Sequence, residues 1–153
     1  MSEWGSTNRV AAHVALADGA AIEGELHLLT RPAYPPGPET PLEMLNRADP
    51  FFVLTLPDGA VTFVAKAQVS VVDCREQPAL TDPDRITAAK LVALEVVLHG
   101  GVEYRGRATV ELPPGRARAL DYVNGPGGFF MLFSDETTHY LTKSFVRLIR
   151  PLD

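Results

Sequence analysis

Charged side chains alternate along two segments of the sequence that are each predicted to form a strand. Glu23 and Glu25 are separated by one residue, and so are Arg105 and Arg107. Because successive side chains of a strand point to opposite faces, each pair is expected to lie on one face of its strand. The opposite charges predict that these strands meet, within the chain or between copies, with electrostatic complementarity setting the register. Two separate, solvated strand faces are the alternative.

A group of basic residues indicates a second chemistry, the binding of a nucleic acid. The candidate contacts are Lys66, its later counterpart Lys143, and Arg147. The overall composition opposes this reading, because 14 Lys and Arg stand against 19 Asp and Glu, a net charge of −5 at pH 7. Few aromatic residues are interleaved to stack on bases. The alternative interpretation of the two lysines is that they are exposed residues that discourage pairing at a strand edge.

Residues that often carry catalysis or bind metals are present, but not in a spacing that indicates a site. The four histidines and the single Cys74 show no metal-ligand spacing. Ser134, Asp135 and His139 are close in sequence, but no nucleophile elbow accompanies them, and Ser and Asp are common in turns. The sequence therefore predicts a non-enzymatic protein that needs no cofactor and no metal.

The composition limits the class of protein further. The chain has 153 residues, of which 46% are hydrophobic and 22% are charged. Its longest apolar run is far shorter than the ~18 residues of a membrane helix, so no membrane association is expected. A single cysteine and an N-terminus unlike a signal peptide predict a cytoplasmic protein. The 12 glycines and 13 prolines lie between apolar runs and favour turns over disorder.

Four blocks of the first half recur in the same order in the second half. They are Val14–Leu26 with Val96–Ala108, Leu42–Asn46 with Leu120–Asn124, Phe51–Leu54 with Phe129–Leu132, and Phe63–Val72 with Tyr140–Ile149. Such an order predicts a tandem duplication. We expect one repeat over residues 1–79 and the other over residues 80–153. Because each repeat is small for an isolated core, the two are expected to pack as one unit.

Each repeat has the pattern of five strands and one helical turn. The second strand contains a glycine, Gly24 or Gly106, which predicts a sharp bend or bulge. A proline-containing loop and a short helical turn come next, and three further strands complete the repeat. Strongly bent antiparallel sheets this short favour closure into small barrels, which protects their edges. The predicted fold is all-β, with two tandem five-stranded barrels and a helical turn before each third strand.

The third strands, FFVLTL and FFMLF, are continuously apolar, which predicts burial on both faces. One face is expected to fill the barrel, and the other to be covered by the helical turn, the sister barrel or another subunit. A face left uncovered would be a protein-binding groove. Asn46 and Asn124 precede these strands and are expected to close the helical turns in the left-handed conformation. Contact with a ligand is the alternative role for them.

The hairpin pattern V-x-L-x-x-G-x-x-x-x-G-x-L and the closing K-x-x-V-x-V/L segment resemble the small SH3-like barrels of the Sm and Sm-like class. Over roughly residues 10–150, the chain is also similar to an uncharacterised bacterial tandem-repeat family, on the segment Leu120–Asn124 followed by an F-x-x-L strand. The resemblance implies the barrel fold. The Sm pattern of Asp and Asn after the second strand and Arg-Gly in the last hairpin is replaced here, so the resemblance supports the fold more than RNA binding.

The sequence therefore predicts a protein-interaction or assembly module that binds a protein partner or itself. Glu23, Glu25, Arg105 and Arg107 are its candidate interaction residues. Sm-like RNA binding is the alternative function.

Overall fold

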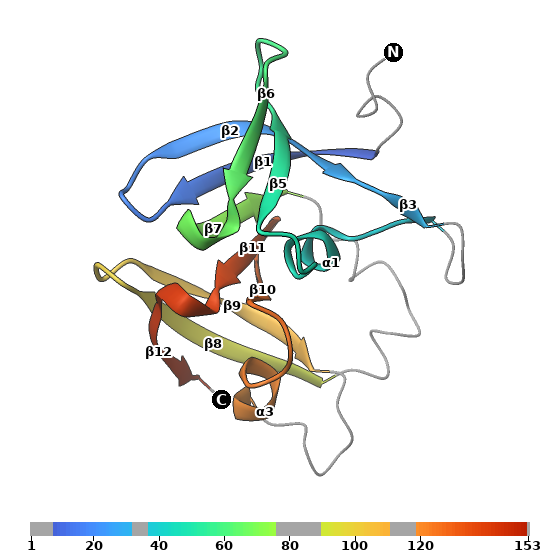
Figure 1. The fold of residues 1–153 in the computed structure, drawn as a ribbon. Helices are drawn as coiled ribbons and strands as arrows, with labels where there is room; N and C mark the ends of the chain where they lie inside the picture. The colour runs from blue at the N-terminus through green and yellow to red at the C-terminus, as the bar shows by residue number, and fades with distance from the viewer. Residues whose placement is uncertain (1–7, 32–36, 76–89, 111–118, 153) are drawn as a thin grey trace.

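The structure, a computed structural model, describes residues 8–31, 37–75, 90–110 and 119–152. Ten strands form one antiparallel sheet, which confirms the prediction of an all-β fold (Figure 1). The sheet is open, and its strand order is β12-β8-β9-β10-β11-β7-β1-β2-β5-β6. A separate small sheet pairs β3 (Thr30–Arg31) with β4 (Gly37–Pro38).

Half of the large sheet, which we call the first strand set, comes from residues 8–74. Its strands are β1 (Asn8–Leu16), β2 (Ala21–Leu28), β5 (Phe51–Thr55), β6 (Val61–Ala65) and β7 (Val69–Cys74). Helix α1 (Pro41–Leu45) precedes β5, and the 3-10 helix η2 (Lys66–Gln68) joins β6 to β7. The start of α1 is determined by a capping box between Thr40 and Glu43, with proline at the first helical position.

The second strand set follows the same plan. Its strands are β8 (Lys90–Leu98), β9 (Glu103–Val110), β10 (Phe129–Ser134), β11 (Thr137–Thr142) and β12 (Val146–Pro151). Helix α3 (Ala119–Val123) precedes β10, and the 3-10 helix η5 (Lys143–Phe145) joins β11 to β12. A helical turn thus stands before the third strand of each set. The predicted boundary between residues 79 and 80 lies outside the described residues.

The two sets share the register of their strand pairs. Phe51 of β5 lies opposite Ala65 of β6, and the matching Phe129 of β10 lies opposite Thr142 of β11. The irregularities match as well, because the pairing of β7 with β1 skips Ser70 and the pairing of β12 with β8 skips the residue after Val146. The paired strand residues of one set therefore have counterparts in the other.

Pairing between β11 of the second set and β7 of the first set joins the two halves. Tyr140 lies opposite Val72, and Leu141 lies opposite Val71. Apolar side chains cross this junction, since Tyr140 and Phe129 pack in the core of the first set and Val71 packs in the core of the second. The two cores are therefore continuous across the β7–β11 junction.

Glycines in β2 and β9 allow the third strand of each set to cross the second at close range. β2 pairs with β1 along its whole length but with β5 through only two residue pairs. A Cβ atom on Gly24 would lie 2.6 Å from the carbonyl oxygen of Thr55, and one on Gly106 would overlap the carbonyl oxygen of Phe133. The steep crossing of β2 by β5 in Figure 1 therefore requires glycine at this position.

The third strands of the two sets differ in how well their outer faces are covered. β10 is buried on both faces, with Phe130 in the core of the second set and Phe129 in that of the first. Tyr122 of α3 covers β10 as well, because its ring meets Phe130 edge-on with 6.3 Å between the ring centroids. β5 buries its inner face, but Phe51 at its start is exposed. Burial on both faces thus holds for β10, and the outer face of β5 is left partly uncovered.

Candidate functional site

The charged residues selected from the sequence lie on two strands that are not neighbours. β2, which carries Glu23 and Glu25, lies between β1 and β5 in the sheet. β9, which carries Arg105 and Arg107, lies between β8 and β10. The structure therefore does not bring the acidic and the basic pair together within one chain, and a meeting of these strands between copies stays a prediction.

Several of these charges are used within their own strand set. Arg9 and Glu25, both exposed, form an ion pair with 3.6 Å between Nη1 and Oε1. Glu95 of β8 is buried, and guanidinium groups flank it on two sides: Arg105 Nη2 lies 3.3 Å from its Oε1, and Arg150 Nη1 lies 3.4 Å from its Oε2. Because a buried carboxylate is costly unless it is paired, Arg105 has a structural role.

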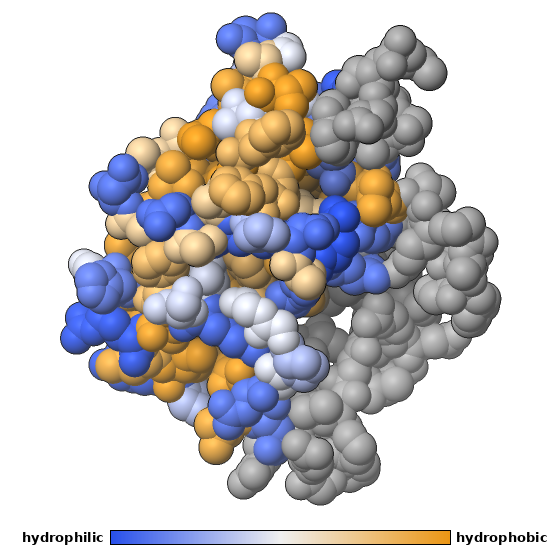
Figure 2. All heavy atoms as spheres, in the orientation of Figure 1, coloured by the Kyte–Doolittle hydropathy of each residue, from blue (hydrophilic) through white to orange (hydrophobic). Residues whose placement is uncertain are grey.

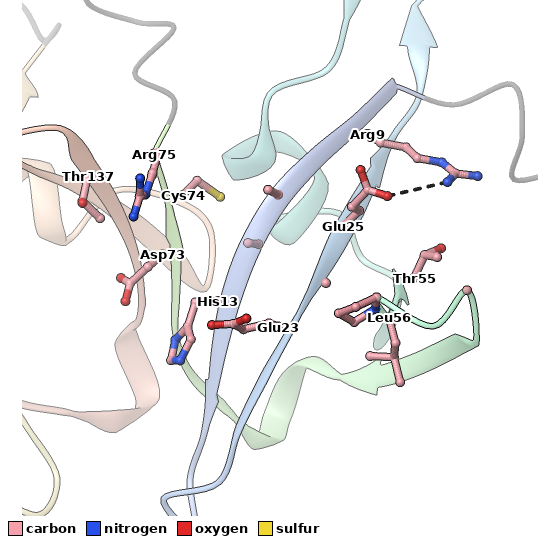
Figure 3. A pocket seen from close by; sticks show the side chains of 15 residues that line it. Arg9, His13, Glu23, Glu25, Thr55, Leu56, Asp73, Cys74, Arg75 and Thr137 are labelled. Carbon is pink, nitrogen blue, oxygen red and sulfur yellow. Dashed lines mark ion pairs between the residues drawn. The ribbon is translucent and has the colours of Figure 1, made fainter.

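The acidic and the basic pair line separate hollows in the surface. A groove of about 950 Å³ contains the acidic pair (Figure 3). The charged residues along it are Arg9, Glu23, Glu25, Asp73 and Arg75, and His13 also lines it. A second hollow, of about 530 Å³, contains Arg105 and Arg107. The larger groove mixes both signs of charge and favours neither an anionic nor a cationic ligand, and no group of three or more potential metal ligands occurs among the described residues.

Lys66 and Lys143, two of the candidate nucleic-acid contacts, bind the C-terminal ends of the short helices. The Nζ atom of Lys66 donates to the carbonyl oxygens of Met44 at 3.1 Å and Arg47 at 3.0 Å, and that of Lys143 donates to the carbonyl oxygen of Gly125 at 2.7 Å. Burial lowers the pKa of both lysines, and the charge of Arg47 adds to this effect at Lys66. A cation at a helix C-terminus satisfies carbonyl groups that lack helical partners, so both lysines are structural rather than free strand-edge charges.

Asn46 connects the two strand sets. Its Nδ2 donates to the carbonyl oxygen of Phe129 at 3.2 Å, and its Oδ1 accepts from the N–H of Phe129 at 2.9 Å. Its φ angle is −89°, so the expected left-handed conformation is wrong for this residue. Gly127 leaves room for the contact, because a Cβ atom there would lie 2.7 Å from the Asn46 amide. The recurrence of asparagine in both halves is the sequence feature that pointed to this residue.

Polar side chains add specific contacts to the β7–β11 junction. His139 Nδ1 lies 2.5 Å from Asp73 Oδ1, and the ring of Tyr104 lies 4.8 Å from the imidazole ring between centroids. The hydroxyl of Thr142 donates to the carbonyl oxygen of Val69 at 2.7 Å. A buried side-chain bond of this kind favours one register over a slipped one, so the junction is well specified.

Apolar side chains remain exposed at the end of the sheet that β6 forms. We use the name β6 edge for Phe51, Val61 and Phe63, of which Phe51 is 56% and Phe63 is 64% exposed. Figure 2 shows apolar atoms gathered over β5 and β6 on this face. Among the strands that the structure describes, β6 pairs with β5 alone, so its other side offers backbone groups for pairing. The sequence predicts a covered third strand and gives an uncovered face only as an alternative, and it does not indicate Phe63, whose match with Tyr140 was the available clue.

The other end of the sheet is β12, and it also exposes apolar side chains. We use the name β12 edge for Leu120 of α3, Leu148 of β12 and Leu152, all of which are exposed. Arg147, the third candidate nucleic-acid contact, is exposed on the same strand, as is Arg150. The structure therefore does not gather Arg147 and the two helix-bound lysines into one array of free cations.

No family model, no curated protein and no solved structure matches the chain. In the part of the chain that the structure describes, no helix is long and apolar enough to cross a membrane. The geometry of the two sheet edges is thus the basis for inferring function.

Proposed function

We propose that this chain is a non-enzymatic protein-interaction or assembly module that binds a protein strand along the β6 edge. The observation that carries the proposal is an open strand flanked by exposed phenylalanines, Phe51 and Phe63. A strand added to β6 would pair with its backbone and cover these side chains, a common mode of peptide recognition. Exposed apolar surface in an otherwise polar surround is typical of protein-binding sites.

We also propose that each strand set is a small five-stranded barrel of the SH3-like or Sm-like kind. The shared strand order, with the fifth strand beside the first, supports this, as do the close crossings at Gly24 and Gly106. In this view the barrels act as a rigid support that presents β6. Cys74, the single cysteine of the chain, forms no disulfide, which favours a cytoplasmic location, where cysteines stay reduced.

The proposal is tested by comparing three forms of the full chain as bait: the wild type, Phe63→Glu and Val102→Glu. Val102 is a matched control because it is an exposed apolar residue in the β8–β9 hairpin, away from β6. We expect that the wild type and Val102→Glu retain a protein partner and that Phe63→Glu does not. The partner can be another copy of the chain. Binding should also slow hydrogen exchange of the β6 amides. Equal retention by all three forms, with unchanged exchange in β6, contradicts the proposal.

A further inference from the structure

The β7–β11 junction shows how two strand sets of this chain fit together. The fourth strand of one set, β11, pairs antiparallel with the fifth strand of the other, β7. The counterpart of β11 in the first set is β6, and the counterpart of β7 in the second set is β12. These two strands are the ends of the open sheet. The chain therefore contains one formed junction and the two unmatched halves of a second.

Exposure differs sharply between positions at the formed junction and their counterparts at the two ends. Tyr140 of β11 is 1% exposed, whereas Phe63, its counterpart on β6, is 64% exposed. Val71 of β7 is 1% exposed, whereas Leu148, its counterpart on β12, is 37% exposed. Phe63 and Leu148 are thus exposed at the two ends of the sheet, at positions whose counterparts are buried at the formed junction.

The backbone groups at the two ends point outward at the required positions. The N–H of Lys66 donates to Pro50 beside β5, and the N–H of Leu152 donates to Ala93 of β8. Because alternate residues of a strand direct their backbone groups to opposite sides, Phe63 directs its groups away from β5, and Ile149 directs its groups away from β8. These two residues are the counterparts of Tyr140 and Val72, which lie opposite each other at the junction.

We propose that the occupant of the β6 edge is a second copy of this chain, which pairs its β12 edge with β6 in the register of the β7–β11 junction. Phe63 then lies opposite Ile149 of the second copy, and Val64 lies opposite Leu148. This inference rests on the proposed function and names its partner. The pairing ends at Pro151, which lacks an N–H to donate to β6.

Contacts outside the strands follow the same correspondence. At the formed junction α1 lies against β10 of the other set. The counterparts of these elements are α3 and β5, so Leu120 of one copy is placed near Phe51 of the next, and both are exposed in the single chain. The counterpart of Gly127, which leaves room for Asn46 at the formed junction, is Asp49. The new interface therefore lacks a contact like that of Asn46 and depends on strand pairing and apolar contact.

Charge favours pairing between unlike ends over pairing between like ends. β12 exposes Arg147 and Arg150, which would repel their own copies if two β12 strands met. Residues 1–79 carry five Lys and Arg against ten Asp and Glu, so the half that contains β6 is acidic. The resulting contact is head-to-tail, and it can be repeated from copy to copy until the assembly closes.

The mass of the full chain in solution tests this inference with two variants. Phe63→Glu blocks the β6 edge and leaves the β12 edge intact, and Leu148→Glu does the opposite. The wild type and the control Val102→Glu should form species of several times the 16.6 kDa chain mass, and each edge variant alone should be a monomer. An equimolar mixture of the two edge variants should form a heterodimer, because one intact β6 edge then meets one intact β12 edge.

The heterodimer also shows that both variants are folded, since each must supply an intact edge. A wild type that stays monomeric at high concentration overturns the inference, and so does a Leu148→Glu variant that assembles like the wild type. In either case, a different protein whose retention still depends on Phe63 would leave the proposed function standing. Loss of every Phe63-dependent partner would remove both proposals.

Discussion

Phe63 and Tyr140 occupy the same position in two matching hairpins, yet Phe63 is 64% exposed and Tyr140 is 1% exposed. The difference arises because Tyr140 lies on a strand that is paired on both sides, whereas Phe63 lies on a strand at the end of the sheet. The same position is thus covered in one half of the chain and uncovered in the other. This relationship underlies the inference that β6 is a binding edge.

Asn46 is predicted to stabilise the join between the strand sets. Asn46→Ala removes two hydrogen bonds to Phe129. The N–H and the carbonyl oxygen of Phe129 then lose these partners. We expect the free energy of unfolding in urea to fall by about 1–3 kcal/mol. Asn124→Ala is the matched control, since Asn124 is exposed, and a change within about 0.5 kcal/mol is expected there. Equal effects of the two substitutions would show that Asn46 does not hold the sets together.

Tyr122 is predicted to make stability depend on alkaline pH. Its hydroxyl donates to the carbonyl oxygen of Met131 at 2.7 Å and accepts from the N–H of Met131 at 3.1 Å. Burial raises the pKa of Tyr122 from 10 to about 12, although the bond to the Met131 backbone acts in the opposite direction.

The sign follows from which state loses the phenol proton first. Above pH 10 the unfolded chain releases this proton while the folded chain retains it, so the free energy of unfolding falls as the pH rises towards 12. The stabilisation is fully present below pH 10, and its loss amounts to about 2–3 kcal/mol over this interval. Urea unfolding of Tyr122→Phe should lack this decrease. A decrease of the same size in the wild type and the variant would rule out Tyr122 as its source.

Lys66 is predicted to act in stability and not in nucleic-acid binding. Lys66→Met keeps the aliphatic stem but removes the bonds to Met44 and Arg47, so the free energy of unfolding should fall by about 1–2 kcal/mol. Arg147→Met, at an exposed position, is the control and should change it by less than about 0.5 kcal/mol.

The same two variants, together with Lys143→Met, address the RNA-binding alternative. Fluorescence anisotropy with a labelled single-stranded RNA at low salt should show no binding that depends on Lys66, Lys143 or Arg147. Binding that weakens steeply with salt and is lost in these variants would favour the Sm-like function instead.

Ala65 is predicted to be a position at which association can be strengthened. Its counterpart, Thr142, donates its hydroxyl to the carbonyl oxygen of Val69 across the formed junction at 2.7 Å. The counterpart of Val69 is Val146, so Ala65→Thr should place a hydroxyl near the Val146 carbonyl of the next copy. One added hydrogen bond of ~1 kcal/mol would lower the dissociation constant about fivefold. Sedimentation should show this change for Ala65→Thr and not for Ala67→Thr, whose hydroxyl would lie on η2.

Local patterns in the sequence predicted the parts of the fold that depend on neighbours along the chain. Gly24 and Gly106 mark strand crossings, because a side chain at either position would collide with the next strand. The short helical turn predicted before the third strand is α1, which begins at Pro41. Such features need only the residues around them, so a single sequence carries them.

Contacts between the two halves could not be predicted in this way. Aligning the two halves of the sequence places Glu25 and Arg107 at matched positions, and their opposite charges suggested that the two strands meet. Two matched positions occupy the same place in their own strand sets. The formed junction, in contrast, joins unlike strands, β7 of one set and β11 of the other. Matched residues are therefore equivalent but not adjacent. The exposure of Phe51 against the burial of Phe129 has the same origin, because only one of the two sets has a neighbour on that side.

The most direct test of head-to-tail pairing is a disulfide cross-link between two copies at positions that would lie opposite each other. At the formed junction His139 and Asp73 lie opposite each other with their side chains in contact, and their counterparts are Thr62 and Arg150. Paired residues of this kind have Cα atoms within the range that a disulfide spans. A Thr62→Cys chain is mixed with an Arg150→Cys chain under mild oxidation, and the wild type, whose Cys74 is buried, is the control. The pairing proposed here predicts a cross-linked heterodimer in the mixture and none with either variant alone. Cross-linking of Thr62→Cys to itself, or no cross-link in the mixture, would contradict it.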